Sequence, residues 1–157
     1  MNDEKISDPT ADIAVWRADK EMRDATERKK AYLRRYHTAE LAEKTIQEEI
    51  DKLRLEKMFP ALNQDGMPHG NTCMDLSEYA AQLDELLTEL KTQMEKRIKI
   101  RWEITRKIEA MRDETEKTIL RLRYIHWRRW DQIAEWMGYS KRNIMKIHER
   151  ALRNFKM

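Results

Sequence analysis

Residues 130–155 read WDQIAEWMGYSKRNIMKIHERALRNF, and this stretch decides how the C-terminal part of the chain folds. Two helical patterns flank the sequence Gly138-Tyr139-Ser140. The glycine suits a left-handed turn position that other residues find strained, and the serine can cap the helix that follows. A short helix, a tight turn with glycine and a longer basic helix together predict a helix-turn-helix.

Each of these two helices has an apolar inward face, and the second also has a basic outward face. The inward positions are Trp130, Ile133, Ala134 and Met137, then Ile144, Ile147, Ala151 and Phe155. In a helix-turn-helix the start of the second helix enters the major groove, where its side chains read base edges while nearby cations hold phosphates. The candidate DNA-binding residues are therefore Arg128, Arg129, Ser140, Lys141, Arg142, Asn143, Met145, Lys146, Arg150 and Arg153.

A longer stretch, TILRLRYIHWRRWDQIAEWMGYSKRNIMKIHERALRNF, resembles region 4 of bacterial sigma factors, the domain that reads the −35 promoter element. The match is closest in IAEWMGYSKRNIMKIHERAL. With a coiled coil ahead of it, the whole chain resembles small phage-encoded late transcriptional regulators of the ArpU- and RinA-like type. The resemblance implies base contacts from Lys141, Arg142, Met145 and Lys146, a contact with RNA polymerase, and a place in the cytoplasm of a bacterial host cell.

The sequence departs from the sigma pattern at two places. His126-Trp127-Arg128-Arg129 replaces the Gly or Asn turn and the Ser or Thr that usually precede the Trp of the second helix. Met145 stands where sigma factors commonly have an arginine. A thioether cannot pair with guanine but can touch a thymine methyl group, so we expect a target other than a standard −35 element.

Composition and periodicity predict a nearly all-α chain. Charged residues make up 39% and apolar residues 40%, with three glycines and three prolines, a mixture rich in helix formers and poor in turn residues. Two heptad seams lie ahead of the helix-turn-helix. The first is Tyr32, Tyr36, Ala39, Glu43, Ile46, Ile50, Leu53 and Lys57; the second is Leu76, Ala80, Leu83, Leu87, Leu90, Met94, Arg97, Arg101, Ile104, Ile108 and Met111.

Two long helices on either side of one loop most simply form an antiparallel hairpin, although the same seams can equally pair between chains. Thr115 can cap a further helix over 116–126. We therefore expect a disordered N-terminus at 1–9 and a helical coiled-coil stalk at 10–113 with a loop near 59–75. A sigma region 4-like helix-turn-helix domain follows at 114–157.

Charge is distributed unevenly along the chain. Residues 119–157 contain ten Lys and Arg against three Asp and Glu, whereas the remainder contains 22 against 26. A basic end on an acidic body favours a polyanionic partner there. A charge run on a helix is more often only a solvated face, so the basic helix alone does not establish DNA binding.

Other motifs indicate no catalysis. Paired acids in the seams are solvated surface, and no phosphate-binding loop or nucleophile elbow occurs, so we expect no enzyme and no cofactor. His69 and Cys73 lack two further ligands nearby, so we expect no metal. The single cysteine suits a reducing compartment, and no apolar run is long enough to span a bilayer. Of the clustered tryptophans, we expect Trp130 in the core, with Trp127 and Trp136 partly exposed.

Three hypotheses remain. The first is a sequence-specific double-stranded-DNA-binding regulator of prophage late genes, a homo-oligomer through its coiled coil. The second is a small terminase subunit that recognises a packaging site and assembles as a ring. The third is a helical assembly module that does not bind DNA.

Overall fold

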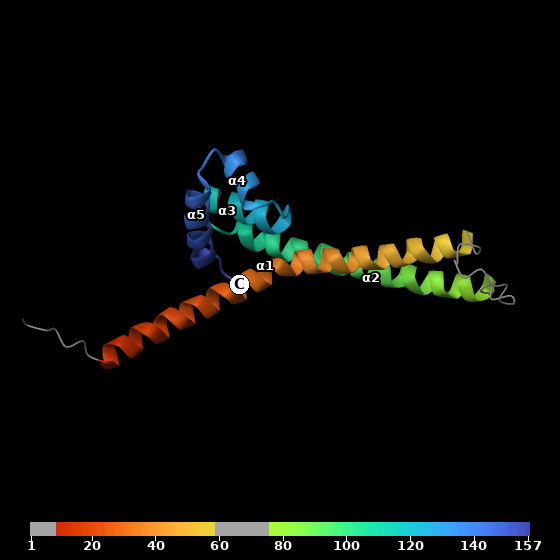
Figure 1. The fold of residues 1–157 in the computed structure, drawn as a ribbon, viewed down its shortest axis with the longest axis horizontal. Helices are drawn as coiled ribbons and strands as arrows, with labels where there is room; N and C mark the ends of the chain where they lie inside the picture. Colours follow the sequence, from red (N-terminus) through yellow and green to blue (C-terminus); the bar gives the residue numbers. More distant parts are fainter. Residues whose placement is uncertain (1–8, 59–75) are drawn as a thin grey trace, which may run out of the picture. The chain divides into compact units, whose positions relative to one another are not determined.

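The computed structural model describes residues 9–58 and 76–157, and in these ranges every regular element is helical (Figure 1). The prediction of an all-α protein is confirmed. The N-terminal residues 1–8 and the loop expected at 59–75, with His69 and Cys73, lie outside the described residues. The elements in chain order are α1 (Pro9–Met58), α2 (Leu76–Glu109), α3 (Glu114–Leu120), the π-helical turn η2 (Arg121–Ile125), α4 (Trp130–Met137) and α5 (Lys141–Asn154).

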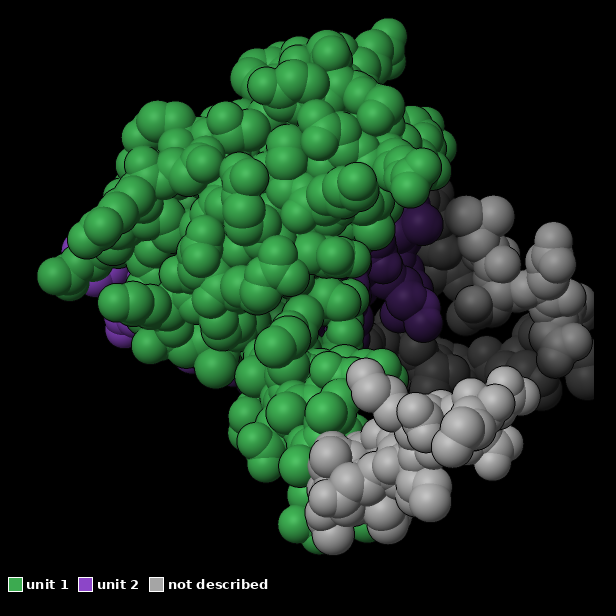
Figure 2. All heavy atoms as spheres, turned by 90° about the vertical axis from the view of Figure 1, so that its left-hand side faces the viewer, with its two compact units in different colours: residues 1–35, 104–157 green, residues 36–103 purple. Residues whose placement is uncertain are grey.

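Two compact units share these helices, as Figure 2 shows by colour. One unit comprises Tyr36–Glu103, and the other comprises Met1–Arg35 together with Ile104–Met157. Both α1 and α2 therefore contribute to both units. The division between the compact units falls at 35/36 and 103/104. The expected domain boundary at 113/114 stays a prediction.

The unit Tyr36–Glu103 is an antiparallel helical hairpin, as the heptad seams predict. Arg97 Nε donates to Glu43 Oε2 at 2.5 Å, and the Arg101 guanidinium lies 6.0 Å from the centre of the Tyr36 ring. Nearer the far end of α1, Lys57 lies 5.7 Å from the Tyr79 ring. Residues nearer the end of α1 thus contact residues nearer the start of α2, so the two helices run in opposite directions.

The seam of α1 faces α2 with its apolar side chains. Glu43, one of the two charged residues in this seam, forms an ion pair with Arg97, one of the two arginines in the α2 seam, so that neither group is left alone in the interface. The seam residues of α1 that are buried in this unit are Tyr36, Ala39, Ile46, Ile50 and Leu53.

The seam of α2 was only partly correct. Ile104 and Ile108 are buried, but Leu87 and Met94 are exposed, and Ile100 is buried where Arg101 was expected. The reason is the helical period. A strict seven-residue repeat drifts by about 20° per heptad around a straight α-helix, so it leaves the face that the helix presents to its partner. The expected seam therefore divides between two faces of α2.

In the other unit, the early part of α1 packs on the end of α5. Leu33 is fully buried, and the rings of Tyr32 and Phe155 lie 6.0 Å apart. Lys29 Nζ donates to the backbone carbonyls of Leu152, at 2.7 Å, and of Arg153, at 3.0 Å. These carbonyls belong to the last turn of α5, where a helix leaves its acceptors without partners and carries partial negative charge. A lysine from α1 therefore completes the end of α5.

The short helices close around a small core. Ile119 of α3, Leu122 of η2, Ile133 and Ala134 of α4, and Ile144 of α5 are buried together, with Trp130 packed against them. The helix expected over 116–126 begins at Glu114, and its cap is Asp113 rather than Thr115. Asp113 Oδ1 accepts from the backbone N–H groups of Thr115, at 2.8 Å, and of Glu116, at 3.0 Å.

Candidate nucleic-acid interface

The turn between α4 and α5 has the geometry that its sequence predicts. Gly138 has φ 68°, in the left-handed region, and its N–H donates to the carbonyl of Glu135 at 3.2 Å, while the N–H of Tyr139 donates to that of Ala134 at 3.0 Å. Ser140 Oγ then accepts from the backbone N–H of Asn143 at 3.2 Å and caps α5. Because α4 ends and α5 begins within three residues, the direction of α5 relative to α4 is fixed by backbone contacts.

The segment 126–129, where the sequence departs from the sigma pattern, is held by its own set of hydrogen bonds. The backbone N–H of Arg129 donates to Gln132 Oε1 at 3.0 Å, and the N–H of Arg128 donates to the carbonyl of Leu122 at 2.9 Å. Arg123 Nη1 also reaches the carbonyl of Arg128 at 3.0 Å. Trp127 takes φ 51°, which is rare for a bulky residue. Gln132 of α4 thus binds the backbone N–H of the residue that directly precedes this helix.

The candidate base-reading residues lie together on the first two turns of α5. All are exposed, and they lie on the helix whose opposite face is buried through Ile144 and Ala151. Lys141 Nζ lies 2.9 Å from Asp131 Oδ1 in an exposed ion pair, which lowers the pKa of the Asp131 carboxyl. The residues of this cluster are Ser140, Lys141, Arg142, Asn143, Met145 and Lys146.

The other four candidates lie elsewhere. Arg129 is exposed just before α4, and Arg128 is half-buried with its guanidinium 5.9 Å from the Trp136 ring. Arg153 is exposed near the end of α5. Arg150 is also exposed, but it is held in an internal network. The structure therefore separates one cluster at the start of α5 from cations that lie on its flanks.

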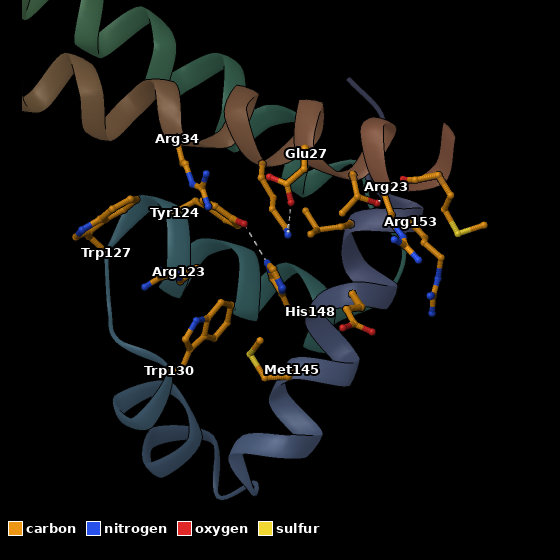
Figure 3. Close-up of a pocket in the computed structure, with 15 residues that line it drawn as sticks. Arg23, Glu27, Arg34, Arg123, Tyr124, Trp127, Trp130, Met145, His148 and Arg153 are labelled. Atoms are coloured by element: carbon orange, nitrogen blue, oxygen red, sulfur yellow. Dashed lines mark hydrogen bonds and ion pairs between the residues drawn. The ribbon is translucent and has the colours of Figure 1, made fainter. Parts of the chain in front are cut away.

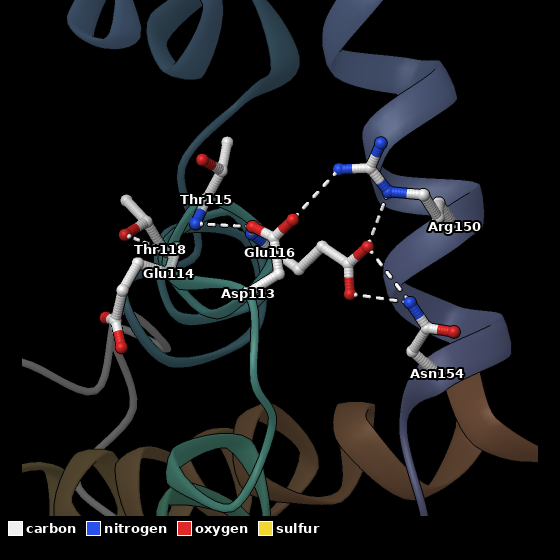
Figure 4. A network of polar contacts seen from close by, with 7 residues as sticks. All are labelled: Asp113, Glu114, Thr115, Glu116, Thr118, Arg150 and Asn154. Carbon is white, nitrogen blue, oxygen red and sulfur yellow. Dashed lines mark hydrogen bonds and ion pairs between the residues drawn. The ribbon is translucent and has the colours of Figure 1, made fainter.

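Figure 4 shows the network that holds Arg150. Arg150 Nε donates to Glu116 Oε1 at 2.6 Å, and its Nη2 donates to Asp113 Oδ2 at 3.2 Å. Asn154 Nδ2 donates to both oxygens of Glu116, at 3.1 and 2.9 Å. The backbone N–H of Glu116 lowers the pKa of the Asp113 carboxyl, and the N–H of Thr115 and the charge of Arg150 act in the same direction. The network fixes α5 to the N-terminus of α3.

Glu116 is the residue of this network that sequence reasoning missed. Glu116 is 1% exposed, and a carboxylate tolerates such burial only when it is paired and hydrogen-bonded. Its partners lie 34 and 38 residues away along the chain, so no local spacing indicates them.

A buried histidine within α5 was missed as well. His148 is buried, its Nε2 shares a 3.0 Å hydrogen bond with the hydroxyl of Tyr124, and its ring meets the edge of Trp130 with centroids 4.7 Å apart. Burial lowers the pKa of His148 to about 4, and the charges of Lys30, Arg123 and Arg34 act in the same direction. The sequence does contain a pattern that indicates this burial, because residues 144, 148, 151 and 155 follow helical steps of four, three and four and so lie on one face of α5.

A basic cleft of about 470 Å³ runs between α1 and the short helices of the same unit (Figure 3). Met145 of the candidate base-reading cluster lies in its lining. Two acids, Glu27 and Glu149, face five cations, and the aromatic side chains of Tyr124, Trp127 and Trp130 line the remainder. The cations are Arg23, Lys30, Arg34, Arg123 and Arg153. A cleft of this charge suits an anion, and it extends the basic surface of α5 onto α1.

The described residues hold neither a metal-binding cluster nor a membrane-spanning helix. Within residues 9–58 and 76–157, no group of three His, Cys, Asp or Glu side chains is placed to hold a metal ion. Among the same residues, no helix combines the length and the apolar character required to cross a membrane.

Comparison with known protein families shows a match over the C-terminal half of the chain. The model of a family described as a protein of unknown function, DUF1492, matches residues 78–156. The match covers most of α2 and all of the short helices. No curated protein matches the chain, and no solved structure matches it.

Proposed function

The chain belongs to the DUF1492 family of proteins of unknown function, and from the geometry of α4 and α5 we propose that it is a sequence-specific, double-stranded-DNA-binding regulator of phage late genes. The family is found in phage proteins, which supports the phage setting. The observation that carries the proposal is the start of α5, where a cluster of exposed polar and cationic side chains follows a glycine turn braced by α4.

The first turns of α5 are suited to the major groove. Arg142 and Lys146 provide long donors for guanine, Asn143 can pair with adenine, and Met145 can contact a thymine methyl group. When the protein binds DNA, Lys141 leaves its ion pair with the exposed Asp131 carboxylate and contacts the duplex instead. Such an exposed ion pair stabilises the free protein little and is readily given up.

Phosphate contacts come from cations on the flanks of the reading cluster. Arg129 lies exposed before α4, and Arg153 lies at the end of α5 where the basic cleft begins. Arg23 of α1 lines the same cleft, so α1 extends the phosphate-binding surface. These contacts position the protein on the duplex and carry no sequence information of their own. Arg150 is assigned instead to holding α5 in place, because its guanidinium is bound by Glu116 and Asp113.

Two partners complete the proposal. A contact with RNA polymerase follows from the resemblance to sigma region 4. Self-association would pair two reading helices and predict two half-sites in the operator.

The test is selection of sheared genomic DNA on immobilised protein at low and moderate salt. We expect one enriched fragment upstream of an operon, and loss of that preference in Lys141→Ala/Arg142→Ala. The matched control is Lys52→Ala/Arg54→Ala, which removes the same charges from exposed positions of α1. Preference that survives the α5 change would contradict the assignment of the reading helix.

Two further outcomes select the alternatives. An enriched fragment inside a packaging locus, together with a ring-sized assembly, would favour a small terminase subunit. If no DNA is retained at either salt concentration, the remaining hypothesis is a helical assembly module that does not bind DNA.

A further inference from the structure

The basic cleft has two ends with different side chains. Figure 3 shows Arg23 and Arg153 at one end and Arg34, Arg123 and Trp127 at the other. Arg23 and Arg34 are eleven residues apart on α1, which is roughly 16 Å along the helix axis. We define the tryptophan end of the cleft as Lys30, Arg34, Arg123, Tyr124, Trp127 and His148.

Three cations converge on the tryptophan end. Lys30 and Arg34 are four residues apart and so lie on one face of α1, and Arg123 lines the cleft from η2. Burial lowers the pKa of His148, and the charges of all three cations act on this ring in the same direction. Lys30 is paired with Glu27 at 2.7 Å, but the whole lining holds five cations and two acids, so positive charge remains in excess.

The same end offers a flat aromatic surface. Trp127 is 37% exposed, and the Arg123 guanidinium lies 5.4 Å from the centre of its ring and 4.7 Å from that of Trp130. Nucleic-acid bases stack on such aromatic rings with little regard to which base is present. The cleft volume of about 470 Å³ falls in the range of small-molecule sites, roughly 300–1,000 Å³, and far exceeds the need of an inorganic anion.

Two uncommon backbone features bring these side chains to the cleft. Arg123 and Tyr124 belong to the π-helical turn η2, and Trp127 has φ 51°. Short π-helical turns are frequent at functional sites, and a bulky residue keeps a positive φ only where the surrounding structure holds it there. Both features lie within five consecutive residues that line one end of one cleft.

We propose that the tryptophan end binds a free nucleotide, with the phosphoryl group held by Lys30, Arg34 and Arg123 and the base stacked on Trp127. The planar guanidinium suits phosphoryl oxygens because it donates two parallel N–H bonds. Duplex DNA presents its phosphates but keeps its bases stacked, so a free nucleotide satisfies both halves of the site. The inference does not rest on DNA binding, which we assign to the start of α5 and to other cations.

The first test is isothermal titration calorimetry of the full chain with adenosine monophosphate as the probe. We expect binding of this nucleotide, with adenosine and inorganic phosphate each at least tenfold weaker, because each supplies one half of the contact. A single-stranded adenine oligonucleotide is the competitor that distinguishes the source of the nucleotide. If it displaces the probe at a lower concentration of nucleotide units, the site belongs to a nucleic-acid strand and the proposal of a free nucleotide is overturned.

The second test compares matched variants. Arg34→Gln should weaken binding of the probe by about tenfold or more, whereas Arg28→Gln, at an exposed position of α1 outside the cleft lining, should leave it unchanged. Trp127→Asn removes the indole, and asparagine tolerates a positive φ. This variant should also weaken binding several-fold, and Trp136→Ala, which removes an indole outside this cleft, should not. Circular dichroism checks that the variants keep their helices.

No binding of adenosine monophosphate, equal binding of adenosine or of inorganic phosphate, or equal affinity in Arg34→Gln and Arg28→Gln would each overturn the proposal. Binding of the nucleotide by a chain that retains no DNA would contradict only the proposed function.

Discussion

The guanidinium of Arg150 is divided between two carboxylates at the start of α3, 2.6 Å from Glu116 Oε1 and 3.2 Å from Asp113 Oδ2. A basic residue on the outward face of a reading helix is indistinguishable in sequence from one that contacts phosphate. In the structure Arg150 instead neutralises Glu116, because this carboxylate is buried and an unpaired buried carboxylate is costly. In the proposed DNA complex Arg150 therefore has only an indirect role, which is to hold α5 in position.

Arg150→Ala should lower the melting temperature of the protein by about 2–4 °C, because it leaves the Glu116 carboxylate without its cation. Adding Glu116→Gln should recover part of the loss, because the amide carries no charge to compensate. Thermal unfolding followed by circular dichroism measures both. Lys146→Ala is the control and should leave the melting temperature unchanged; an equal fall there would mean that Arg150 has no special role.

His148 gives the unit a dependence on acid. Its folded-state pKa of about 4 lies below the ordinary value of 6.5, so between these values the unfolded chain binds the proton and the folded chain does not. The free energy of unfolding should therefore be constant above pH 6.5, as far as this group is concerned, and should fall by up to about 3 kcal/mol as the pH drops toward 4.

Urea denaturation at a series of pH values tests this expectation. His148→Gln keeps a polar partner for Tyr124 but does not titrate, so the variant should lose the slope between pH 6.5 and 5, where most carboxylates are still ionised. His126→Gln is the control at an exposed histidine. If the wild type and His148→Gln have the same slope, burial of this ring does not control the acid response.

At the scale of whole elements, patterns within one helix were readable from the sequence. The apolar steps gave α1, α4 and α5, and the glycine turn at Gly138 follows from its backbone requirement alone. Contacts between distant elements were not readable. Lys29 reaches a carbonyl 123 residues away, and in sequence it is one of many lysines on a charged helix. Leu87 and Met94 were wrongly expected to pack in the α2 seam, because periodicity does not show which face of a helix contacts its partner.

Lys29→Met should destabilise the end of α5 by roughly 0.5–1 kcal/mol, because two of the last carbonyls lose their hydrogen bonds to the Lys29 ammonium together with its compensating charge. Hydrogen exchange should rise at the backbone amides of the last turn, near Phe155, whose N–H is bonded within that turn. Arg28→Met, at the adjacent exposed position, is the control. Equal exchange in the two variants would show that α1 does not secure α5.

At the scale of the whole molecule, the two compact units carry net charges of opposite sign. The unit that contains α5 has 23 Lys and Arg against 15 Asp and Glu, and the unit Tyr36–Glu103 has nine against 14. Sequence analysis located the basic end, but it could not show that residues 9–35 belong with it, because nothing local in α1 marks a change of unit. The basic cleft, with Arg23, was missed for the same reason.

This division predicts which charges control the affinity for DNA. Removing one phosphate contact should reduce the slope of log K against log salt by about 0.9. We expect this change for Arg153→Ala and for Arg23→Ala, with sequence preference retained. Lys52→Ala, in the acidic unit, should leave the slope unchanged. Fluorescence anisotropy over a salt series measures the slopes, and an unchanged slope in both arginine variants would remove the cleft from the interface.

The bond from Lys29 to the end of α5 also sets an order of events during synthesis. At about 5–20 residues per second, the ribosome needs roughly 6–25 s to make the 123 residues that separate the two partners. Residues 36–103 are synthesised before residue 152, so their hairpin can fold before the carbonyl that accepts from Lys29 has been made. The segment around Lys29 thus reaches its partner only after the hairpin has been made, and a chain that stops before residue 152 lacks that partner.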